Sequence, residues 1–222
     1  RISKESAFAR QVKNVMVGLG FQEMAYCYLG SARDYIERMN ITPEKVVQIA
    51  NPMSENFEFV RPSVLPCLLN SESISSNAVY PHNIFEIGKI ALIDPEENYG
   101  VKTINSIGIL SADKDAGFNS VNSHVSALFF YIGAECELEE TEDPRFIPGR
   151  CAKIISAGRQ VGLAGVHGKG SAPLKLALIL GNQMEVQVAA AVAVGAVVDL
   201  IGTEYLVDGV GSSCHIRKEE VA

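Results

Sequence analysis

Apolar residues recur at three- and four-residue spacing in two segments of the chain. In the first segment, residues 4–17, the spacing indicates one broad apolar face, and Ser3 is placed to cap the first turn. The apolar stripe there consists of Phe8, Val12, Val15, Met16 and Leu19. The second segment runs from about Gly117 to Gly133, and a final glycine is typical of a helix end. The pattern therefore predicts two amphipathic helices.

Shorter apolar runs bounded by turn residues predict β-strands. The expected strands cover residues 21–29, 45–50, 84–92, 106–110, 151–156 and 160–164. Ala157-Gly158-Arg159 joins the last two and suits a tight hairpin, because glycine tolerates a left-handed backbone. Short helices are expected after Ser31 and from Leu65, with Ser63 as a cap. The sum is an α+β domain whose sheet is mainly antiparallel.

The C-terminal part contains two more apolar runs, at residues 174–180 and 186–198. Both are nearly continuous, which favours central strands buried on two faces. A loosely attached segment from Gly181 onward is the alternative. The run from Val186 to Ile201 is interrupted by polar residues and is too short for the roughly 20 residues of a membrane helix, so no membrane contact is expected.

Composition narrows the classes of function. The 222 residues include 47% hydrophobic and 20% charged residues, and the net charge is −7, which argues against a surface built to neutralise phosphates. The five cysteines are scattered, without the close Cys/His spacing of a zinc site. We therefore expect a reduced, cytoplasmic protein without metal. Because the sequence begins with Arg1 and shows no targeting segment, we expect an excised or processed piece.

Three motifs in a fixed order carry a family resemblance. Asn51-Pro52 precedes the run RPSVLPCLL at residues 61–69, IFEIGK follows at residues 84–89, and FIPGRCA follows at residues 146–152. Together they resemble the β subunits of phenylalanyl-tRNA synthetases, of archaeal or eukaryotic type, or a close paralogue. The resemblance covers residues 1–167 as a synthetase-like core. Residues 168–222 form a divergent tail that we expect to complete the same domain.

The resemblance implies a class II aminoacyl-tRNA synthetase-like antiparallel sheet flanked by helices. It places the helix of residues 4–17 where the first class II motif serves subunit association. Four residues of its stripe are then candidates for partner contact: Val12, Val15, Met16 and Leu19. The implied partner is the α subunit of a heterotetramer, with tRNA bound through the complex. A homodimer is expected when the domain is isolated.

The resemblance also implies where the chemistry does not lie. A working class II synthetase holds ATP phosphates with arginines, whose planar fork matches phosphate oxygens. The strand at residues 83–92 contains Lys89 but no arginine, and the glycine pair at residues 209–211 lacks the arginine of the third class II motif. We therefore assign no catalytic, cofactor-binding or metal-binding residue to this domain. ATP and magnesium are implied for the holoenzyme, in which the α partner attaches phenylalanine to tRNA.

The remaining charged positions have two interpretations each. Arg150 follows Pro148-Gly149 and either organises the turn, which is the favoured interpretation, or pairs with a carboxylate on a partner or within the fold. Arg61 either starts a helix or contacts a partner. For His124 we expect a solvated position, and for the acidic residues 135–143 a solvated strand edge rather than a metal site. Two other functions stay open: a stand-alone paralogue that binds an amino acid or other small molecule, and an enzyme of unknown reaction.

Overall fold

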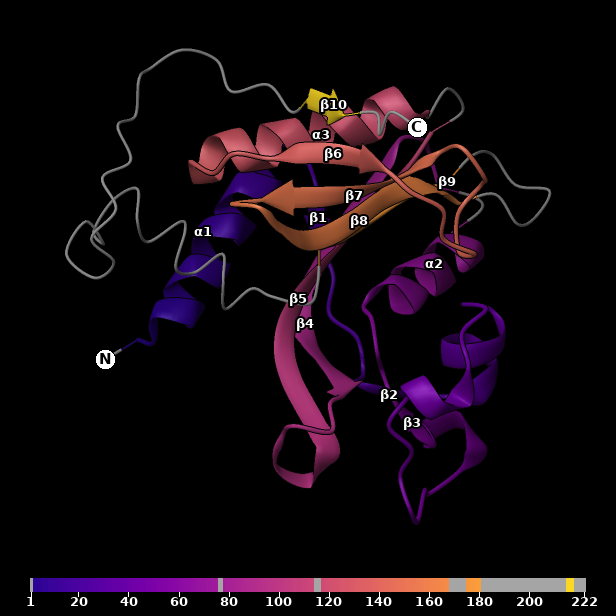
Figure 1. The fold of residues 1–222 in the computed structure, drawn as a ribbon. Helices are drawn as coiled ribbons and strands as arrows, with labels where there is room; N and C mark the ends of the chain where they lie inside the picture. The colour runs from indigo at the N-terminus through magenta and orange to yellow at the C-terminus, as the bar shows by residue number, and fades with distance from the viewer. Residues whose placement is uncertain (1, 76–77, 114–116, 168–174, 181–214, 218–222) are drawn as a thin grey trace, which may run out of the picture.

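A large sheet with helices on both faces forms the centre of the computed structural model (Figure 1), which describes residues 2–75, 78–113, 117–167, 175–180 and 215–217. The described strands of this sheet follow the order β1-β4-β5-β9-β8-β7-β6-β10. Their bounds are β1 Gln22–Glu23, β4 His82–Ile93, β5 Val101–Ala112, β6 Glu137–Glu140, β7 Cys151–Ser156, β8 Arg159–His167, β9 Lys175–Leu180 and β10 His215–Arg217. The sheet is antiparallel except at its two ends, where β1 pairs parallel to β4 and β10 pairs parallel to β6.

A smaller lobe lies beside the sheet. Its two strands, β2 Leu29–Gly30 and β3 Phe59–Val60, pair antiparallel. Around them are one π-helical turn and two 3-10 turns: η1 Arg33–Glu37, η2 Pro43–Lys45 and η3 Glu55–Phe57. A further 3-10 turn, η4 Asn98–Gly100, joins β4 to β5. The lobe has its own small apolar cluster of Tyr35, Ile36, Val46 and Phe59.

Both predicted amphipathic helices are present, as α1 Lys4–Gly18 and α3 Phe118–Ile132. The Ser3 hydroxyl accepts a hydrogen bond from the Ser6 amide at 3.1 Å, which satisfies one of the free donors of the first turn of α1. Helix α3 ends at Gly133 in the left-handed conformation (φ 74°). The two helix ends that the sequence predicted, at Ser3 and Gly133, are therefore confirmed.

The two faces of the sheet are covered by different helices. Along β5, Ile109 contributes to the cluster that contains α1 and α3, whereas its neighbour Leu110 contributes to the cluster that contains α2 (Leu65–Ile74). This alternation follows from the strand period of two. At Gly108 the approach of α2 is close: an added Cβ would lie 3.0 Å from side-chain atoms of Val64 and Leu68. The sheet is therefore the middle layer of three.

Two predicted strands are wrong in extent. The expected strand of residues 21–29 is divided into β1 and β2, because the chain between them leaves the ladder and the Tyr26 amide bonds to the Glu86 carboxylate instead. The expected strand of residues 45–50 is replaced by η2 and an isolated bridge between Gln48 and Phe59. Apolar composition alone could not predict either outcome, since the pairing partner decides it.

The other predicted strands are confirmed. Strands β4 and β5 are longer than expected, and β7 and β8 are joined through Ala157 (φ 49°) and Gly158 (φ 72°). The run at residues 174–180 forms β9, which pairs with both β5 and β8. The second run of the tail, residues 186–198, lies outside the described residues.

One expectation about the cysteines is corrected. Cys27, Cys67 and Cys151 are free thiols, but Cys136 is disulfide-bonded, so the expectation of a fully reduced chain fails at that residue. The scattered spacing of the cysteines along the sequence could not indicate that Cys136 is bonded. Within the described ranges, every helix is too short or too polar to cross a membrane.

Candidate functional site

The strongest electrostatic feature of the domain is a buried ion pair between Arg61 and Glu86. Arg61 lies between β3 and α2 and is fully buried, and Glu86 lies on β4. The two guanidinium nitrogens Nη1 and Nη2 each donate to one carboxylate oxygen at 2.9 Å. The third donor, Nε, reaches the carbonyl of Lys89 at 2.9 Å. Arg61 therefore connects its own segment to two positions of β4, Glu86 and Lys89.

The main chain and an aromatic ring hold Arg61 in this place. Its amide donates to the Tyr28 carbonyl at 2.9 Å, and its carbonyl accepts from the Ala91 amide at 3.1 Å. The Tyr28 ring lies 4.6 Å from the guanidinium carbon, which is the geometry of a cation–π contact. The residues of the motif RPSVLPCLL thus have two structural roles. Arg61 anchors the motif to β4, and its leucines cover the sheet.

Gly88 of the IFEIGK motif leaves room for this pair. A Cβ at residue 88 would lie 2.0 Å from Nη2 of Arg61, so any larger residue would displace the guanidinium. Glycine is needed at residue 88 because the Arg61 guanidinium approaches the backbone closely there, and not because of a left-handed backbone conformation. The two motifs, at residues 61–69 and 84–89, are therefore parts of one packing arrangement.

Burial and pairing act in opposite directions on Arg61. Burial alone lowers its pKa, but the hydrogen bonds and the charge of Glu86 outweigh burial and raise the pKa above the ordinary value. The neighbouring Cys67 thiol lies 4.0 Å from Nη1, and burial raises the pKa of that thiol. A raised thiol pKa disfavours the reactive thiolate. This cluster is built to hold charge in place and not to attack a substrate.

A second buried polar cluster joins the end of α2 to the start of β4. Nδ1 of His82 lies 2.8 Å from Oε2 of Glu72, and the Tyr80 hydroxyl donates to Oε1 of Glu72 at 3.4 Å. The Tyr80 ring stacks on the His82 ring at 4.3 Å between centroids. His82 Nε2 is buried and has no hydrogen-bond partner among the described residues. Sequence reasoning missed Glu72, Glu86 and His82, although a charged residue inside an apolar strand or helix face is the signal that marks such pairs.

The predicted association stripe on α1 divides into two parts. Val12 (3% exposed) and Met16 (1%) lie in the main core, so the expectation that they form an exposed stripe is corrected. Their side chains pack inside the domain because α1 turns its apolar face onto the sheet and α3. Val15 and Leu19 are only partly buried and lie at the edge of that core.

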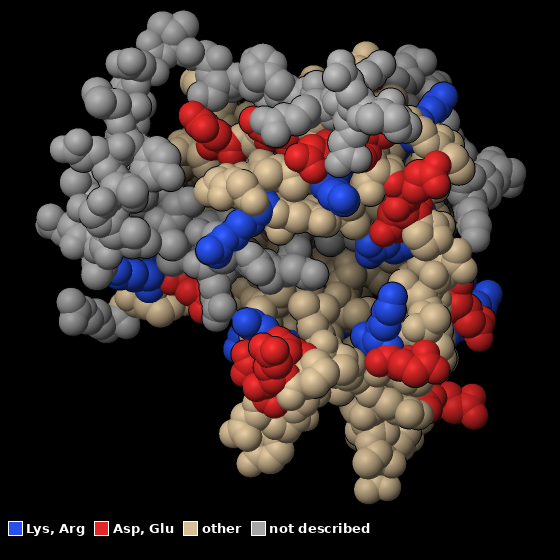
Figure 2. Space-filling model, viewed as in Figure 1, with Lys and Arg blue, Asp and Glu red and all other residues tan. Residues whose placement is uncertain are grey.

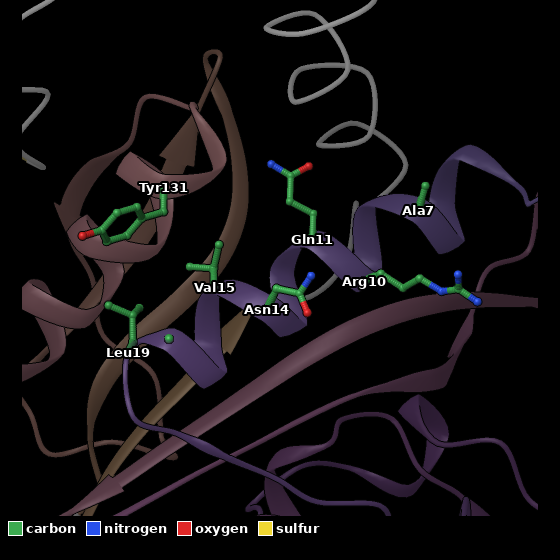
Figure 3. A pocket seen from close by; sticks show the side chains of 8 residues that line it. Ala7, Arg10, Gln11, Asn14, Val15, Leu19 and Tyr131 are labelled. Carbon is green, nitrogen blue, oxygen red and sulfur yellow. The ribbon is translucent and has the colours of Figure 1, made fainter.

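Val15 and Leu19 line a groove along the outer side of α1. The groove has a volume of about 660 Å³, and Figure 3 shows its side chains along the helix, with Tyr131 reaching in from α3. Its lining residues are Ala7, Arg10, Gln11, Asn14, Val15, Gly18, Leu19 and Tyr131. Phe130, beside Tyr131, is 54% exposed. This surface combines amides, one arginine and apolar side chains, a mixture that is usual for protein contacts.

Pro148, Gly149 and Arg150 form an exposed turn before β7. The Arg150 amide donates to the Ile147 carbonyl at 3.0 Å, and Gly149 has a left-handed backbone (φ 70°). The Arg150 carbonyl accepts from the Val166 amide at 2.9 Å. The Arg150 side chain points to solvent and forms no ion pair with any described residue. Its main chain thus organises the turn, while its guanidinium is available for contact.

Two other candidates from the sequence have different surroundings from those expected. His124 is half-buried, with its ring at 5.0 Å and edge-on to the Phe21 ring, and burial lowers its pKa. The expectation of a solvated histidine is therefore wrong. The acidic run contains β6, which lies between β7 and the edge strand β10. No group of three metal-ligating side chains occurs in the described part of the chain. The glycine pair at residues 209–211 lies outside the described residues.

Comparison with known proteins places these features in a family. The family model for the phenylalanyl tRNA synthetase beta chain CLM domain matches residues 1–169. A phenylalanine–tRNA ligase beta subunit of Borrelia hermsii is 50% identical over 155 residues, which are 70% of this chain and 28% of the relative. The beta subunit of Borreliella burgdorferi is 46% identical over 162 residues, covering 73% of this chain and 29% of the relative.

The beta subunit of Treponema pallidum is 44% identical over 165 residues, covering 74% of this chain and 27% of the relative. The chain therefore spans less than a third of the length of these relatives. All three are bacterial, and not from the archaea or eukaryotes that the resemblance suggested. The match ends just after β8, at residue 169.

Proposed function

Because the chain belongs to the family of the phenylalanyl-tRNA synthetase beta chain CLM domain, we propose that it serves as the non-catalytic, synthetase-like core of a β subunit. In this role it supports the ATP-dependent attachment of phenylalanine to tRNA by an α partner. ATP and magnesium bind on the α partner, and the complex is a heterotetramer. The sheet with its flanking helices is then a class II synthetase-like core that has kept the architecture without the phosphate-binding groups.

The state of Arg61 is the observation that carries this proposal. A phosphate-binding arginine needs its donors directed at the ligand. All three nitrogens of the Arg61 guanidinium instead donate to Glu86 and Lys89 within the domain. Removing Arg61 from Glu86 to bind a phosphate would leave the carboxylate buried and unpaired, at a cost of about 3–5 kcal/mol. Lys89, the lysine of β4, is exposed, and its ammonium cannot form a bidentate fork.

Activity measurements with the two purified subunits test the division of labour. The β subunit alone should show no phenylalanine-dependent ATP–pyrophosphate exchange, and addition of the α subunit should restore exchange. Substitution of Lys89 by methionine in the β subunit should leave the exchange rate of the complex unchanged, since Lys89 is not needed for phosphate binding. Exchange by the isolated β subunit above background would refute the proposal.

The groove along α1 is the surface that this role requires for association. Val15→Asp and Leu19→Asp place a charge on the partly buried rim of the groove and should weaken subunit association while the domain still folds. Val12→Asp is the matched comparison, because Val12 is buried and the charge should unfold the domain. Sedimentation of each variant with the partner, together with its thermal unfolding, separates the two effects. Wild-type association of both rim variants would remove this surface from the proposal.

A further inference from the structure

Two projections extend from the same end of the molecule, at the bottom of Figure 2, and each carries an exposed large apolar side chain. One projection is the connection between β4 and β5, where Tyr99 is 95% exposed. The other is the loop before β3, where Met53 is 99% exposed. Figure 1 shows that both lie away from α1 and α3, and hence from the groove described above.

The Tyr99 projection has a fixed shape. The Asp94 amide donates to the Gly100 carbonyl at 3.0 Å, the Gly100 amide donates to the Glu97 carbonyl at 2.9 Å, and the Glu97 amide donates to the Asp94 carbonyl at 3.1 Å. Tyr99 itself has a left-handed backbone (φ 65°, ψ 12°), which is unfavourable for a bulky residue. The Tyr99 side chain is 95% exposed, so packing against the described residues does not explain a tyrosine at this position.

The charges around the two projections are of one sign. Residues 93–100 contain Asp94, Glu96 and Glu97, residues 51–58 contain Glu55 and Glu58, and neither segment contains a lysine or arginine. Lys102, at the base of the hairpin, lies 3.6 Å from Glu97. Carboxylates repel the phosphates of a nucleic acid and attract a basic protein surface. The charge therefore selects a protein partner that is rich in lysine and arginine.

We propose that the Tyr99 and Met53 projections form a second docking surface for the partner chain of the synthetase, and that each tip enters an apolar recess flanked by lysine or arginine. Tyrosine and methionine are enriched in interface cores, and a tyrosine anchor often contributes a large share of the binding energy. A fixed turn reduces the entropy lost on binding. This inference rests on the proposed function, because the partner is the α subunit of that proposal.

Binding of the full-length β subunit to purified α subunit tests the surface. Tyr99→Asn and Met53→Ser should each raise the Kd at least about tenfold, as expected for loss of an interface anchor. The thermal unfolding midpoint of Tyr99→Asn should be equal to or above that of the wild type, because asparagine tolerates the left-handed backbone. Ile74→Ser, which also removes an exposed apolar side chain (79% exposed) but on α2, is the control and should bind as the wild type does.

A charge reversal tests the chemistry of the partner. Glu96→Lys should weaken binding at low salt, and the difference from wild type should shrink as the salt concentration rises. Wild-type Kd values of Tyr99→Asn and Met53→Ser for the α subunit would overturn this inference. It would also be overturned if these variants bound the α subunit normally but bound tRNA, or associated with themselves, more weakly than the wild type. If the wild-type β subunit failed to bind the α subunit at all, the proposed function itself would be wrong.

Discussion

Arg61 and Glu86 meet in the core through two parallel hydrogen bonds of 2.9 Å, and this pair fixes the segment before α2 to the long strand β4. The pair also positions the start of α2, since the helix begins at Leu65, four residues after Arg61, where the Leu65 amide donates to the Ser63 hydroxyl. A buried pair of this kind contributes to a unique arrangement more than to net stability, because removing two charges from water is costly. Its energetic role can be measured.

Breaking the Arg61–Glu86 pair from one side should be more damaging than removing it entirely. Arg61→Met and Glu86→Leu each leave a buried charge without its partner and should each lower the free energy of unfolding by about 3–5 kcal/mol. The double variant replaces both charges with apolar groups and should lose less than either single variant. Urea denaturation of the three variants gives the coupling energy. Additive losses would show that the two side chains do not act as a pair.

Gly88→Ala should disturb the same pair through space. The added methyl group would meet Nη2 of Arg61, so the guanidinium must move, and we expect a loss of about 2–4 kcal/mol in the free energy of unfolding. Gly18→Ala is the control, because that position at the end of α1 is open and alanine favours the helix by about 0.5–1 kcal/mol. In an Arg61→Met background the cost of Gly88→Ala should shrink. An equal cost in both backgrounds would place the clash elsewhere.

The pKa of His124 predicts an acid-sensitive contribution to stability. Burial beside the Phe21 ring lowers the pKa of His124 below its ordinary value, so the folded state binds the proton less readily than the unfolded state. The contribution of neutral His124 is therefore complete above the unfolded pKa and is lost as the pH falls through the folded pKa. His124→Gln cannot titrate and should unfold with a weaker pH dependence between pH 7 and acid. Equal slopes for the two proteins would contradict the burial of this histidine.

Local pattern was sufficient for the elements that determine their own structure. The apolar period and the caps predicted α1 and α3, and short apolar runs bounded by turn residues predicted β4 and β7. The sequence pattern failed where contacts with a distant segment decide the structure. After β1 the regular pairing with β4 stops, and the Tyr26 amide donates to the side chain of Glu86. Residues 45–50 form one isolated bridge, between Gln48 and Phe59. The stripe on α1 was visible in the sequence, but the sequence could not show that α3 and the sheet cover Val12 and Met16.

The buried charges were the least predictable feature of the site. Arg61 and Glu86 lie in two different motifs, and each has an ordinary interpretation as a surface residue when it is considered alone. Each charge can be buried only because it is paired with the other in the folded chain. The motif order therefore identified the family correctly, whereas the physical reason for the motif residues came from the contacts between them.

The tail provides the last prediction, because β9 lies within the sheet although the family match ends before it. Each of its six residues has a partner on β5 and a partner on β8, from Lys175 opposite Ala112 and His167 to Leu180 opposite Ile107 and Gly162. Without β9, the facing edges of β5 and β8 would lose these backbone hydrogen bonds in the middle of the sheet, where water cannot replace them at low cost. The core would also lose its continuity, since α3 contacts both β8 and β9.

A chain that ends after Ser171 should therefore be insoluble or lack cooperative unfolding, whereas a chain that ends after Leu180 keeps β9 and should unfold cooperatively. Circular dichroism melting of the two truncated proteins distinguishes these outcomes, and dye binding to exposed apolar surface should rise only for the shorter one. Two exposed strand edges in the shorter chain would also favour aggregation. If the chain that ends after Ser171 were soluble and melted cooperatively, β5 and β8 would have to close on each other directly, and β9 would not be part of the stable core.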